Sequence, residues 1–298
     1  MKRLKGHPEM YRYSGFSLTI HSQLELPELP NGGGNPDVTI RLGAVSRPRK
    51  LATIDDEVAS PRNIGRFRIT DGSEIMADLL PGVDTGVLRT MLAGPLMAYL
   101  LRQRGYLPLH ASAVAIDGQG VLFLGESGTG KSTTAAAFSV RGHDVLADDL
   151  AAVRVEKSGI ALETAACGLR LLEDSRNAIG ARAKSIGLPG GKHFCSLPRR
   201  ASAGPCGVTR IYLLDYEDSD GPSRVRSSAL CRFSAAALLN ARSFLRDWRA
   251  GDALRQINLD RSAAMATARP VWRLIRPRSL QLLPRLVDFV EKDVQRND

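Results

Sequence analysis

Apolar and polar positions along the first part of the chain alternate in short runs, which is typical of β-strands with one buried face. Such runs, several of them rich in β-branched residues, occupy 14–20, 37–42, 65–70 and 74–80. From 86 to 105 the spacing changes to one apolar residue in four, carried by Leu88, Leu92, Leu96 and Leu100, and this spacing predicts a helix. Gly94-Pro95 predicts a kink inside it, and Gly105 its end. Residues 1–105 are therefore predicted to form a small β-rich domain that ends in a helix.

From Tyr106 onward strands alternate with helices. Strands are predicted at 109–116, 121–125, 143–149, 150–156, 208–217 and 271–277. Helices are predicted from the end of the second of these strands to about Arg141, over 234–248 with Ser234 as N-cap, and over 279–293. This order predicts an α/β nucleotide-binding core over residues 106–298. The irregular segment 187–200, "GLPGGKHFCSLPRR", is either a lid or a plain surface loop.

Composition limits the class of protein. Of 298 residues 43% are hydrophobic and 24% charged, as in soluble globular proteins. The net charge of +10 indicates either a merely basic surface or attraction for an anionic partner such as ATP, an acidic peptide or nucleic acid. No aromatic-rich basic motif accompanies the charge, so we expect no nucleic-acid partner.

The cysteines and apolar stretches indicate where the protein resides. The four cysteines form no Cys-x-x-Cys pair, which fits a reducing compartment. The basic N-terminus is not followed by the apolar segment of a signal peptide. The longest apolar stretch is interrupted by Arg89 and Pro95 and is too short to span a bilayer. We therefore expect a cytoplasmic protein with no membrane partner.

One motif carries specific chemistry. The stretch "LFLGESGTGKSTTAAAF" contains Gly125-x-x-x-x-Gly130-Lys131-Ser132, which fits the phosphate-binding loop pattern at every fixed position, between a strand and a helix. Glycines let backbone N–H groups wrap an anion, and the helix N-terminus adds a positive dipole end. The pattern predicts that Lys131 reaches the β- and γ-phosphates of ATP and that Ser132 coordinates Mg²⁺. The predicted ATP-binding residues are Gly125, Glu126, Ser127, Gly128, Thr129, Gly130, Lys131, Ser132 and Thr133.

Two adjacent acids follow. Asp148 and Asp149 end the strand "HDVLADD", where a parallel sheet presents its ligand-binding residues. Two acids allow two functions, metal binding and proton abstraction from an attacking hydroxyl, although a capping or turn pair is the alternative. His110 opens the strand before the loop strand, and it is either a packed histidine or a cation that stabilises the transferring phosphoryl group.

Together these pieces resemble the HPr serine kinase/phosphorylase family. Its members carry a histidine before the loop, a Gly-Glu-Ser-Gly-x-Gly-Lys-Ser loop, a helix that ends in Arg-Gly-His, and an Ala-Asp-Asp strand end. The stretch "LHASAVAIDGQGVLFLGESGTGKSTTAAAFSVRGHDVLADD" has all four in this order. The resemblance implies a fold of the PEP-carboxykinase/HPr-kinase type, with Asp148 as general base for a seryl hydroxyl, Asp149 at the Mg²⁺ site, and His110 and Lys131 supporting the transfer.

The chain also departs from that family. The signature Pro-Glu-x-Arg-Gly-Leu-Gly is absent, and "ETAACGLRLLEDS" stands in its place, so phosphorylase activity is not carried over. Glu163 and Glu173 are the nearest candidates for the metal-binding glutamate of that signature. The layout, with its β-rich front domain, resembles the HPr-kinase-like lasso-peptide precursor kinases, which phosphorylate a C-terminal serine.

The sequence thus predicts an ATP- and Mg²⁺-dependent serine kinase that acts on a peptide or small protein. Two alternatives stay open: a small-molecule kinase of PEP-carboxykinase-like fold, and a nucleotide-binding regulatory protein with slow ATPase activity. Homo-oligomerisation is open as well.

Overall fold

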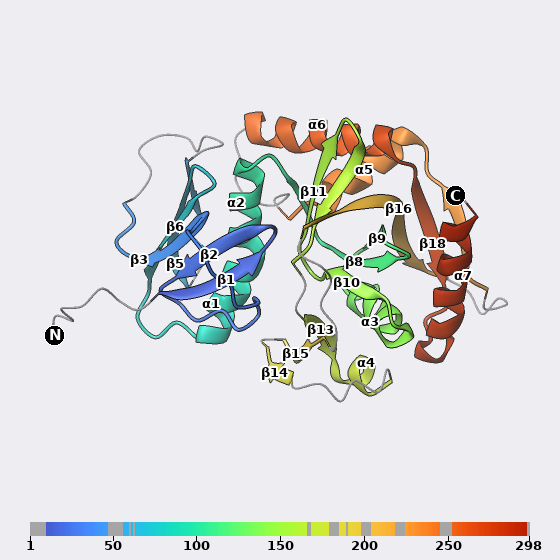
Figure 1. The fold of residues 1–298 in the computed structure, drawn as a ribbon, viewed down its shortest axis with the longest axis horizontal. Coiled ribbons are helices and arrows are strands. Elements are labelled where there is room, and N and C mark those ends of the chain that lie inside the picture. The colour runs from blue at the N-terminus through green and yellow to red at the C-terminus, as the bar shows by residue number, and fades with distance from the viewer. Residues whose placement is uncertain are drawn as a thin grey trace.

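The structure is a computed structural model that describes residues 10–46, 56–59, 61, 63–165, 168–178, 185–188, 190–197, 204–217, 224–244 and 252–296. It is a mixed α/β fold in which a small sheet with its own helix stands beside a larger sheet covered by helices (Figure 1). We call the described residues from 10 to 105 the front unit. No helix in the described part of the chain combines the length and the apolar character that a membrane crossing needs.

The front unit contains a six-stranded sheet. Its strand order is β1 (Tyr11–Gly15), β2 (Leu18–Ser22), β3 (Val38–Leu42), β6 (Glu74–Leu79), β5 (Gly65–Thr70) and β4 (Asp56–Ala59). The single strand predicted over 14–20 is wrong, because Phe16 and Ser17 form a tight turn between β1 and β2 with φ angles of 56° and 57°. Left-handed residues at both turn positions match the twist of an antiparallel hairpin, so a chain reversal lies within the alternating pattern.

The helix predicted over 86–105 is confirmed. It consists of α1 (Thr85–Met91), the π-helical turn η1 (Leu92–Leu96) and α2 (Met97–Gln103). Asp84 caps it, since its carboxylate accepts a hydrogen bond of 2.8 Å from the backbone N of Val87. Pro95 lies in the π-helical turn, where the hydrogen-bond spacing is already altered. The four leucines of the predicted stripe are all buried against the front sheet.

The larger sheet has nine strands. Its main path is β10 (Asp144–Ala147), β8 (Ala111–Ile116), β9 (Gln119–Leu124), β16 (Pro205–Tyr216), β12 (Gly159–Glu163), β11 (Ala151–Glu156) and β7 (Leu107–Leu109). Off this path, β18 (Val271–Arg276) pairs with β16, and β17 (Arg226–Ala229) pairs with β18. Only β9 with β16 and β16 with β18 are parallel among the described strand pairs of this sheet, so the sheet is mixed. The parallel arrangement expected around the strand before Asp148 is wrong, because β10 pairs with β8 in the antiparallel direction.

Helices cover both faces of this sheet (Figure 1). One face packs against α5 (Arg232–Ala241) and α6 (Asp252–Ala268), the other against α3 (Lys131–Arg141) and α7 (Leu283–Gln295), which follows the 3₁₀ turn η2 (Leu280–Leu282). The N-cap prediction for Ser234 is wrong, because α5 begins at Arg232 with Cys231 at the cap position. That helix ends at Ala241, and residues 245–248 of the prediction lie outside the described residues.

A third, three-stranded sheet stands beside α3. It contains β13 (Gly168–Leu172), β15 (Lys192–Ser196) and β14 (Ser185–Gly187), and α4 (Glu173–Ala178) follows β13. The irregular segment 187–200 therefore contributes an ordered strand where it is described, while residues 189 and 198–200 lie outside the described residues. That this segment closes as a lid stays a prediction.

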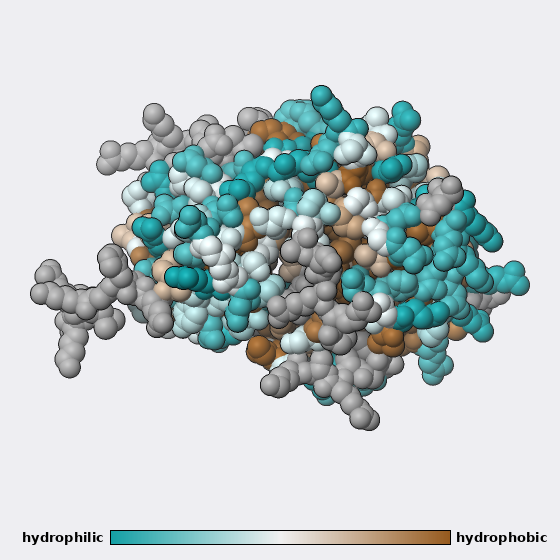
Figure 2. Space-filling view, viewed as in Figure 1, coloured by the Kyte–Doolittle hydropathy of each residue, from teal (hydrophilic) through white to brown (hydrophobic). Residues whose placement is uncertain are grey.

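The two predicted domains share buried surface. One cluster of buried side chains runs from the front unit to Tyr106, Leu150 and Ala152 of the larger part. Figure 2 shows a largely hydrophilic face on which apolar residues appear at the edges as well as near the middle. The domain boundary at 105 stays a prediction.

Candidate functional site

Strand direction brings the three predicted segments to one edge of the larger sheet. Strand β8 is antiparallel to both β9 and β10, so β8 begins where the other two end. The register pairs Ala111 with Leu124 and Ala113 with Ala147. His110, the glycine loop and Asp148-Asp149 therefore lie together, as the motif order predicted.

The glycine loop needs glycine at two positions for reasons of space. Gly130 has a φ of 81°, and a Cβ there would come within 2.2 Å of the Arg276 guanidinium. Gly125 has a φ of 154°, and a Cβ there would meet the Thr129 hydroxyl at 2.5 Å. The loop is therefore wound tightly and pressed against the neighbouring strands.

Lys131 lies beneath this loop. Its Nζ donates to the carbonyl oxygens of Gly125 (3.0 Å) and Glu126 (2.9 Å), and the residue is only 7% exposed. Burial lowers the pKa of Lys131 to about 8, and the nearby Asp149 and Asp148 charges act in the opposite direction. The lysine thus holds a position from which phosphate oxygens could replace the two carbonyls as acceptors.

The Asp148 carboxylate is surrounded by hydrogen-bond donors. Its carboxylate accepts hydrogen bonds from the Ser112 hydroxyl (2.6 Å), the backbone N of Arg170 (2.8 Å) and the Ser132 side chain. Burial nevertheless raises the pKa of Asp148, although the Ser112 and Arg170 bonds oppose the shift. A carboxylate with a raised pKa is a stronger proton acceptor once ionised.

Asp149 has different partners and a pKa shifted in the opposite direction. It has a φ of 71°, its carboxylate forms an ion pair with Arg170, and its Oδ1 lies 3.1 Å from His110 Nδ1. His110 Nδ1 also lies 3.1 Å from the backbone oxygen of Asp149, so both neighbours are acceptors and Nδ1 carries the proton. Burial alone would raise the pKa of Asp149, but the His110 hydrogen bond and the Arg170 charge hold it well below its usual range. The pKa of Asp148 is thus raised and that of Asp149 lowered, so Asp148 is the more basic carboxylate of the two.

The oxygen donors at this edge suit a hard cation. The Ser132 hydroxyl and the carboxylates of Asp148 and Asp149 meet at this edge beside Lys131, and hydroxyl and carboxylate oxygens are the ligands that Mg²⁺ takes alongside phosphates and water. Within the described ranges no three His, Cys, Asp or Glu side chains gather as a complete metal cage. The donor set therefore fits a cation shared with a nucleotide.

Of the two glutamate candidates, Glu163 has other partners. Its carboxylate accepts hydrogen bonds from the Ser17 hydroxyl (2.5 Å) and the Tyr106 hydroxyl (2.8 Å), and so it links the front unit to β12. Glu173 begins α4 and is exposed.

Several residues that shape the site were not predicted from the sequence. Arg170 contacts both aspartates, and Arg242 donates a hydrogen bond to Glu126 at 3.0 Å. The positive charge of Lys192 lowers the pKa of both Lys131 and Asp149. The alternating segment "GLRLL" was a usable strand signal for Arg170, but nothing local indicated its partners.

A side chain from strand β18 supports the loop through a hydrogen bond to its backbone. The buried Arg276 donates to the Thr129 carbonyl oxygen at 2.9 Å and lies over the Tyr216 ring, 5.0 Å from its centroid. The Tyr216 hydroxyl in turn donates to the Gly128 carbonyl oxygen at 3.3 Å. Side chains at the ends of β16 and β18 thus hold the backbone of the loop in its curved shape.

Arg276→Met is therefore expected to weaken ATP binding about tenfold, because it removes a charge-assisted bond to the loop while keeping an apolar stem. Arg278→Met is the matched control, since Arg278 is exposed and lies over the same ring (4.6 Å). Titration calorimetry with ATP on both variants checks this. Equal affinity in the two variants would contradict the proposed support.

The fold and the site together define a mixed α/β protein with a phosphate-binding-loop sequence. Residues 105–179 match the model of the HPr Serine kinase C-terminal domain family. This part of the chain therefore has distant, partial homology to the HPr kinase/phosphorylases, and it contains His110, the glycine loop, the two aspartates and Arg170.

Curated relatives match over short stretches. The HPr kinase/phosphorylase of Caldicellulosiruptor bescii is 51% identical over 45 residues, 15% of this chain and 14% of that protein. Those of Caldanaerobacter subterraneus subsp. tengcongensis (51% over 51 residues, 17% and 16%) and of a Geobacillus species (42% over 57 residues, 19% and 18%) are similar. The chain spans less than a fifth of the length of these relatives. The solved HPr(Ser) kinase/phosphatase from Coxiella burnetii aligns over 64% of this chain and 95% of that one, with a TM-score of 0.32 and 15% identity.

Proposed function

We propose that this protein is an ATP-dependent kinase that transfers the γ-phosphate to a serine hydroxyl of a peptide or small protein. The observation that carries the proposal is the meeting of Lys131 and the glycine loop with Asp148 at one sheet edge. The kinase activity implied by the family match is consistent with it.

Residues of the loop would hold the nucleotide. The backbone N–H groups from Gly125 to Thr133 surround the phosphates, Lys131 donates to the β- and γ-phosphates, and Ser132 and Asp149 would bind Mg²⁺. The cation, when bound, neutralises charge on the phosphates. Lys131 would give up its bonds to the two loop carbonyls on binding.

The transfer step falls to Asp148. The seryl oxygen attacks the γ-phosphorus as its proton passes to the Asp148 carboxylate, the bond from the γ-phosphorus to the β–γ bridging oxygen breaks, and ADP leaves. Support comes from the raised pKa of Asp148, since a stronger base accepts this proton more readily. The contact between Asp148 and Ser132 supports the reverse assignment as well, with Asp148 at the metal and Asp149 as base.

His110 would act through Asp149. Its Nδ1 hydrogen bonds and the edge-on packing of its ring on Phe244 (centroids 5.4 Å apart) fix the carboxylate orientation. His110→Ala is expected to lower turnover about tenfold or more, with ATP affinity nearly unchanged. Steady-state kinetics and nucleotide binding on one purified sample measure both.

His143→Ala is the control for that variant. His143 Nε2 also lies close to a carboxylate, 2.8 Å from Glu291 Oε1, but between α3 and α7. This variant should have a lower melting temperature than the wild type and an unchanged turnover rate. A His110→Ala protein that behaves in the same way would assign His110 a packing role alone.

The acceptor is a separate question. The layout resembles lasso-peptide precursor kinases, so a precursor peptide with a C-terminal serine is the first acceptor to test. Incubation with γ-labelled ATP should yield a labelled peptide whose label resides on phosphoserine. A labelled small molecule, or ATP turnover without transfer, would contradict the proposal and favour the small-molecule kinase or the regulatory ATPase.

A further inference from the structure

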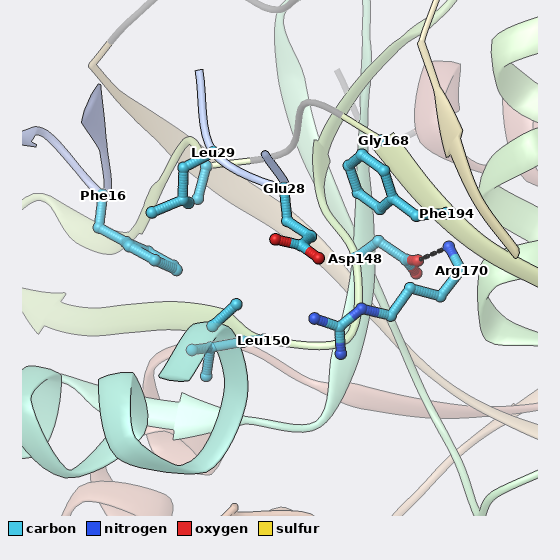
Figure 3. Close-up of a pocket in the computed structure, with 10 residues that line it drawn as sticks. Phe16, Glu28, Leu29, Asp148, Leu150, Gly168, Arg170 and Phe194 are labelled. Atoms are coloured by element: carbon cyan, nitrogen blue, oxygen red, sulfur yellow. Dashed lines mark hydrogen bonds between the residues drawn. The ribbon is translucent and has the colours of Figure 1, made fainter. Parts of the chain in front are cut away.

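A groove lies between α6, the paired strands β7 and β11, and the end of the front unit. Its volume is about 620 Å³, within the range of about 300–1,000 Å³ that is usual for ligand pockets. Figure 1 shows α6 crossing one end of β11, close to α2. The cavity beside Asp148 and Arg170 (Figure 3) is much smaller, at about 40 Å³, and shares no described lining residue with the groove.

The lining of this groove is basic and aliphatic. Its arginines come from three elements, since Arg104 follows α2, Arg154 lies in β11 and Arg261 lies in α6, and we call it the arginine groove after these three residues. The one acid among the described lining residues is Asp260, which is exposed and accepts a hydrogen bond from Gln256 Nε2 at 2.7 Å. Three positive charges and one negative charge therefore surround a space whose other walls are mostly apolar.

The arginines bond to neutral groups. They donate to backbone carbonyl oxygens, Arg104 to that of Gly72 (2.9 Å), Arg154 to that of Arg104 (3.1 Å) and Arg261 to that of Tyr106 (2.7 Å). Within the described ranges no carboxylate forms an ion pair with any of the three. A guanidinium has five N–H donors, and the buried Nε of Arg154 has no acceptor among the described residues. The groove thus keeps both positive charge and donor capacity for a ligand.

The arrangement also brings like charges together. Burial lowers the pKa of the Arg261 guanidinium, and the positive charges of Arg102 and Arg154 lower it further. The Arg154 guanidinium is held in place over the Tyr106 ring, 4.1 Å from its centroid. A guanidinium that is already oriented loses less freedom when it binds a planar carboxylate through two parallel hydrogen bonds. An anion in the groove would therefore relieve repulsion and meet a fixed donor.

We propose that the arginine groove docks an acidic segment of the acceptor peptide, in which glutamate or aspartate residues alternate with aliphatic residues. Carboxylates match the arginines, and aliphatic side chains match walls such as Leu107, Val153 and Met265. This inference rests on the proposed kinase function and specifies which peptides the kinase selects.

The two strands that line the groove also lead to the proposed catalytic site. Leu107 and Val153 are paired in register, Leu107 precedes His110 by three residues, and Val153 follows Asp149 by four. At about 3.3 Å per residue, the groove lies roughly 10–13 Å from the site along these strands. One peptide of moderate length can therefore occupy the groove and present its serine at the site.

Two labelled synthetic peptides test the docking. One carries three glutamates that alternate with leucines, joined to a single serine by about eight residues, which span up to about 27 Å, and the other has glutamines in place of the glutamates. Fluorescence anisotropy in saturating ADP measures binding while the glycine loop is occupied. The wild type is expected to bind the acidic peptide at least about tenfold more tightly, and high salt should reduce this preference. Equal affinity for the two peptides would overturn the inference.

Arg154→Gln is expected to weaken binding of the acidic peptide about tenfold, because it removes one charge from the groove. Arg269→Gln is the matched control, since Arg269 is exposed, directly follows α6 and does not line the groove, and its affinity should stay within about twofold of the wild type. Equal affinity in these two variants would contradict the docking site.

Asp260→Asn changes the charge in the opposite direction. The amide oxygen can still accept from Gln256, and the loss of the acid should tighten binding of the acidic peptide about threefold. Partial unfolding cannot produce such a gain, so this variant decides if Arg154→Gln does not fold. An unchanged or weaker affinity would count against the proposal.

Phosphorylation kinetics separate the docking from the kinase function. Docking should lower KM for the acidic peptide about tenfold relative to the neutral one, with kcat within about twofold, and Arg154→Gln should remove this difference in KM. If both peptides are phosphorylated with equal KM, the kinase function stands and the docking fails. If the acidic peptide binds through Arg154 but no serine is phosphorylated, the kinase function fails and the acidic-segment site remains. If citrate binds but neither peptide does, the groove takes a small anion and the proposal is overturned.

Discussion

Asparagine in place of Asp148 is expected to slow phosphoryl transfer about 10²–10⁴-fold. A seryl hydroxyl is a poor nucleophile near neutral pH, and the amide keeps the shape of the side chain but cannot accept the proton. The amide oxygen can still accept from Ser112, so folding and ATP binding should persist. Single-turnover transfer to a serine peptide at saturating ATP measures the loss, and a melting curve on the same sample verifies the fold.

Asp149→Asn is the partner variant. Because Asp149 is proposed to act at the metal, this variant should require a higher Mg²⁺ concentration for half-maximal transfer and lose less of the maximal rate. A Mg²⁺ titration of both variants separates the two assignments. If Asp148→Asn shows the metal defect and Asp149→Asn the loss of rate, the two carboxylates exchange roles.

Lys131→Ala is expected to abolish most ATP binding and nearly all transfer. Each charge-assisted contact to a phosphate contributes roughly 1.5–3 kcal/mol, which corresponds to about 10–150-fold in affinity. The variant also leaves the carbonyls of Gly125 and Glu126 without their present donor, so the loop itself should loosen. Calorimetry measures binding, and a labelled-phosphate assay measures transfer. Phosphoryl transfer at the wild-type rate in this variant would contradict a role of the glycine loop in the reaction.

The pH dependence of binding provides a control that needs no variant. With a pKa of about 8, Lys131 is protonated below that pH and loses its charge as the pH rises through it. Nucleotide affinity should therefore fall above pH 8, and binding at pH 8 should take up a proton because phosphate favours the charged form. Titrations in buffers of different ionisation enthalpy detect this uptake, which should be nearly absent at pH 7.

The chemistry of the site could be predicted because each segment is local. The loop, the two acids and His110 each lie in a short stretch with fixed spacing, and the hydrophobic pattern placed each at a strand end. Their convergence required only the order and direction of β8, β9 and β10. Their individual roles remain predictions.

The supporting contacts could not be predicted, since they join residues far apart in the chain. Arg170 reaches Asp149 only because β13 lies beside α3, and Arg276 reaches Thr129 only because β18 pairs with β16. Helix α6 was not predicted, because "DALRQINLDRSAAMATA" has no clear apolar stripe and its first residues follow an unassigned stretch. The β1–β2 hairpin was hidden because its turn carries Phe-Ser where the usual turn residues are Asn and Gly.

The position of β16 between β9 and β18 has a consequence for how the nucleotide site is assembled. Strand β9 ends at Leu124, but its parallel neighbour begins at Pro205, and the arginine that supports the loop is residue 276. During synthesis the glycine loop therefore leaves the ribosome long before β16 and β18 exist. Contacts of such large sequence separation slow folding and must form cooperatively. The stretch from 105 to 179 that matches the family is thus not expected to fold by itself, because it lacks the strand that pairs with one whole edge of β9.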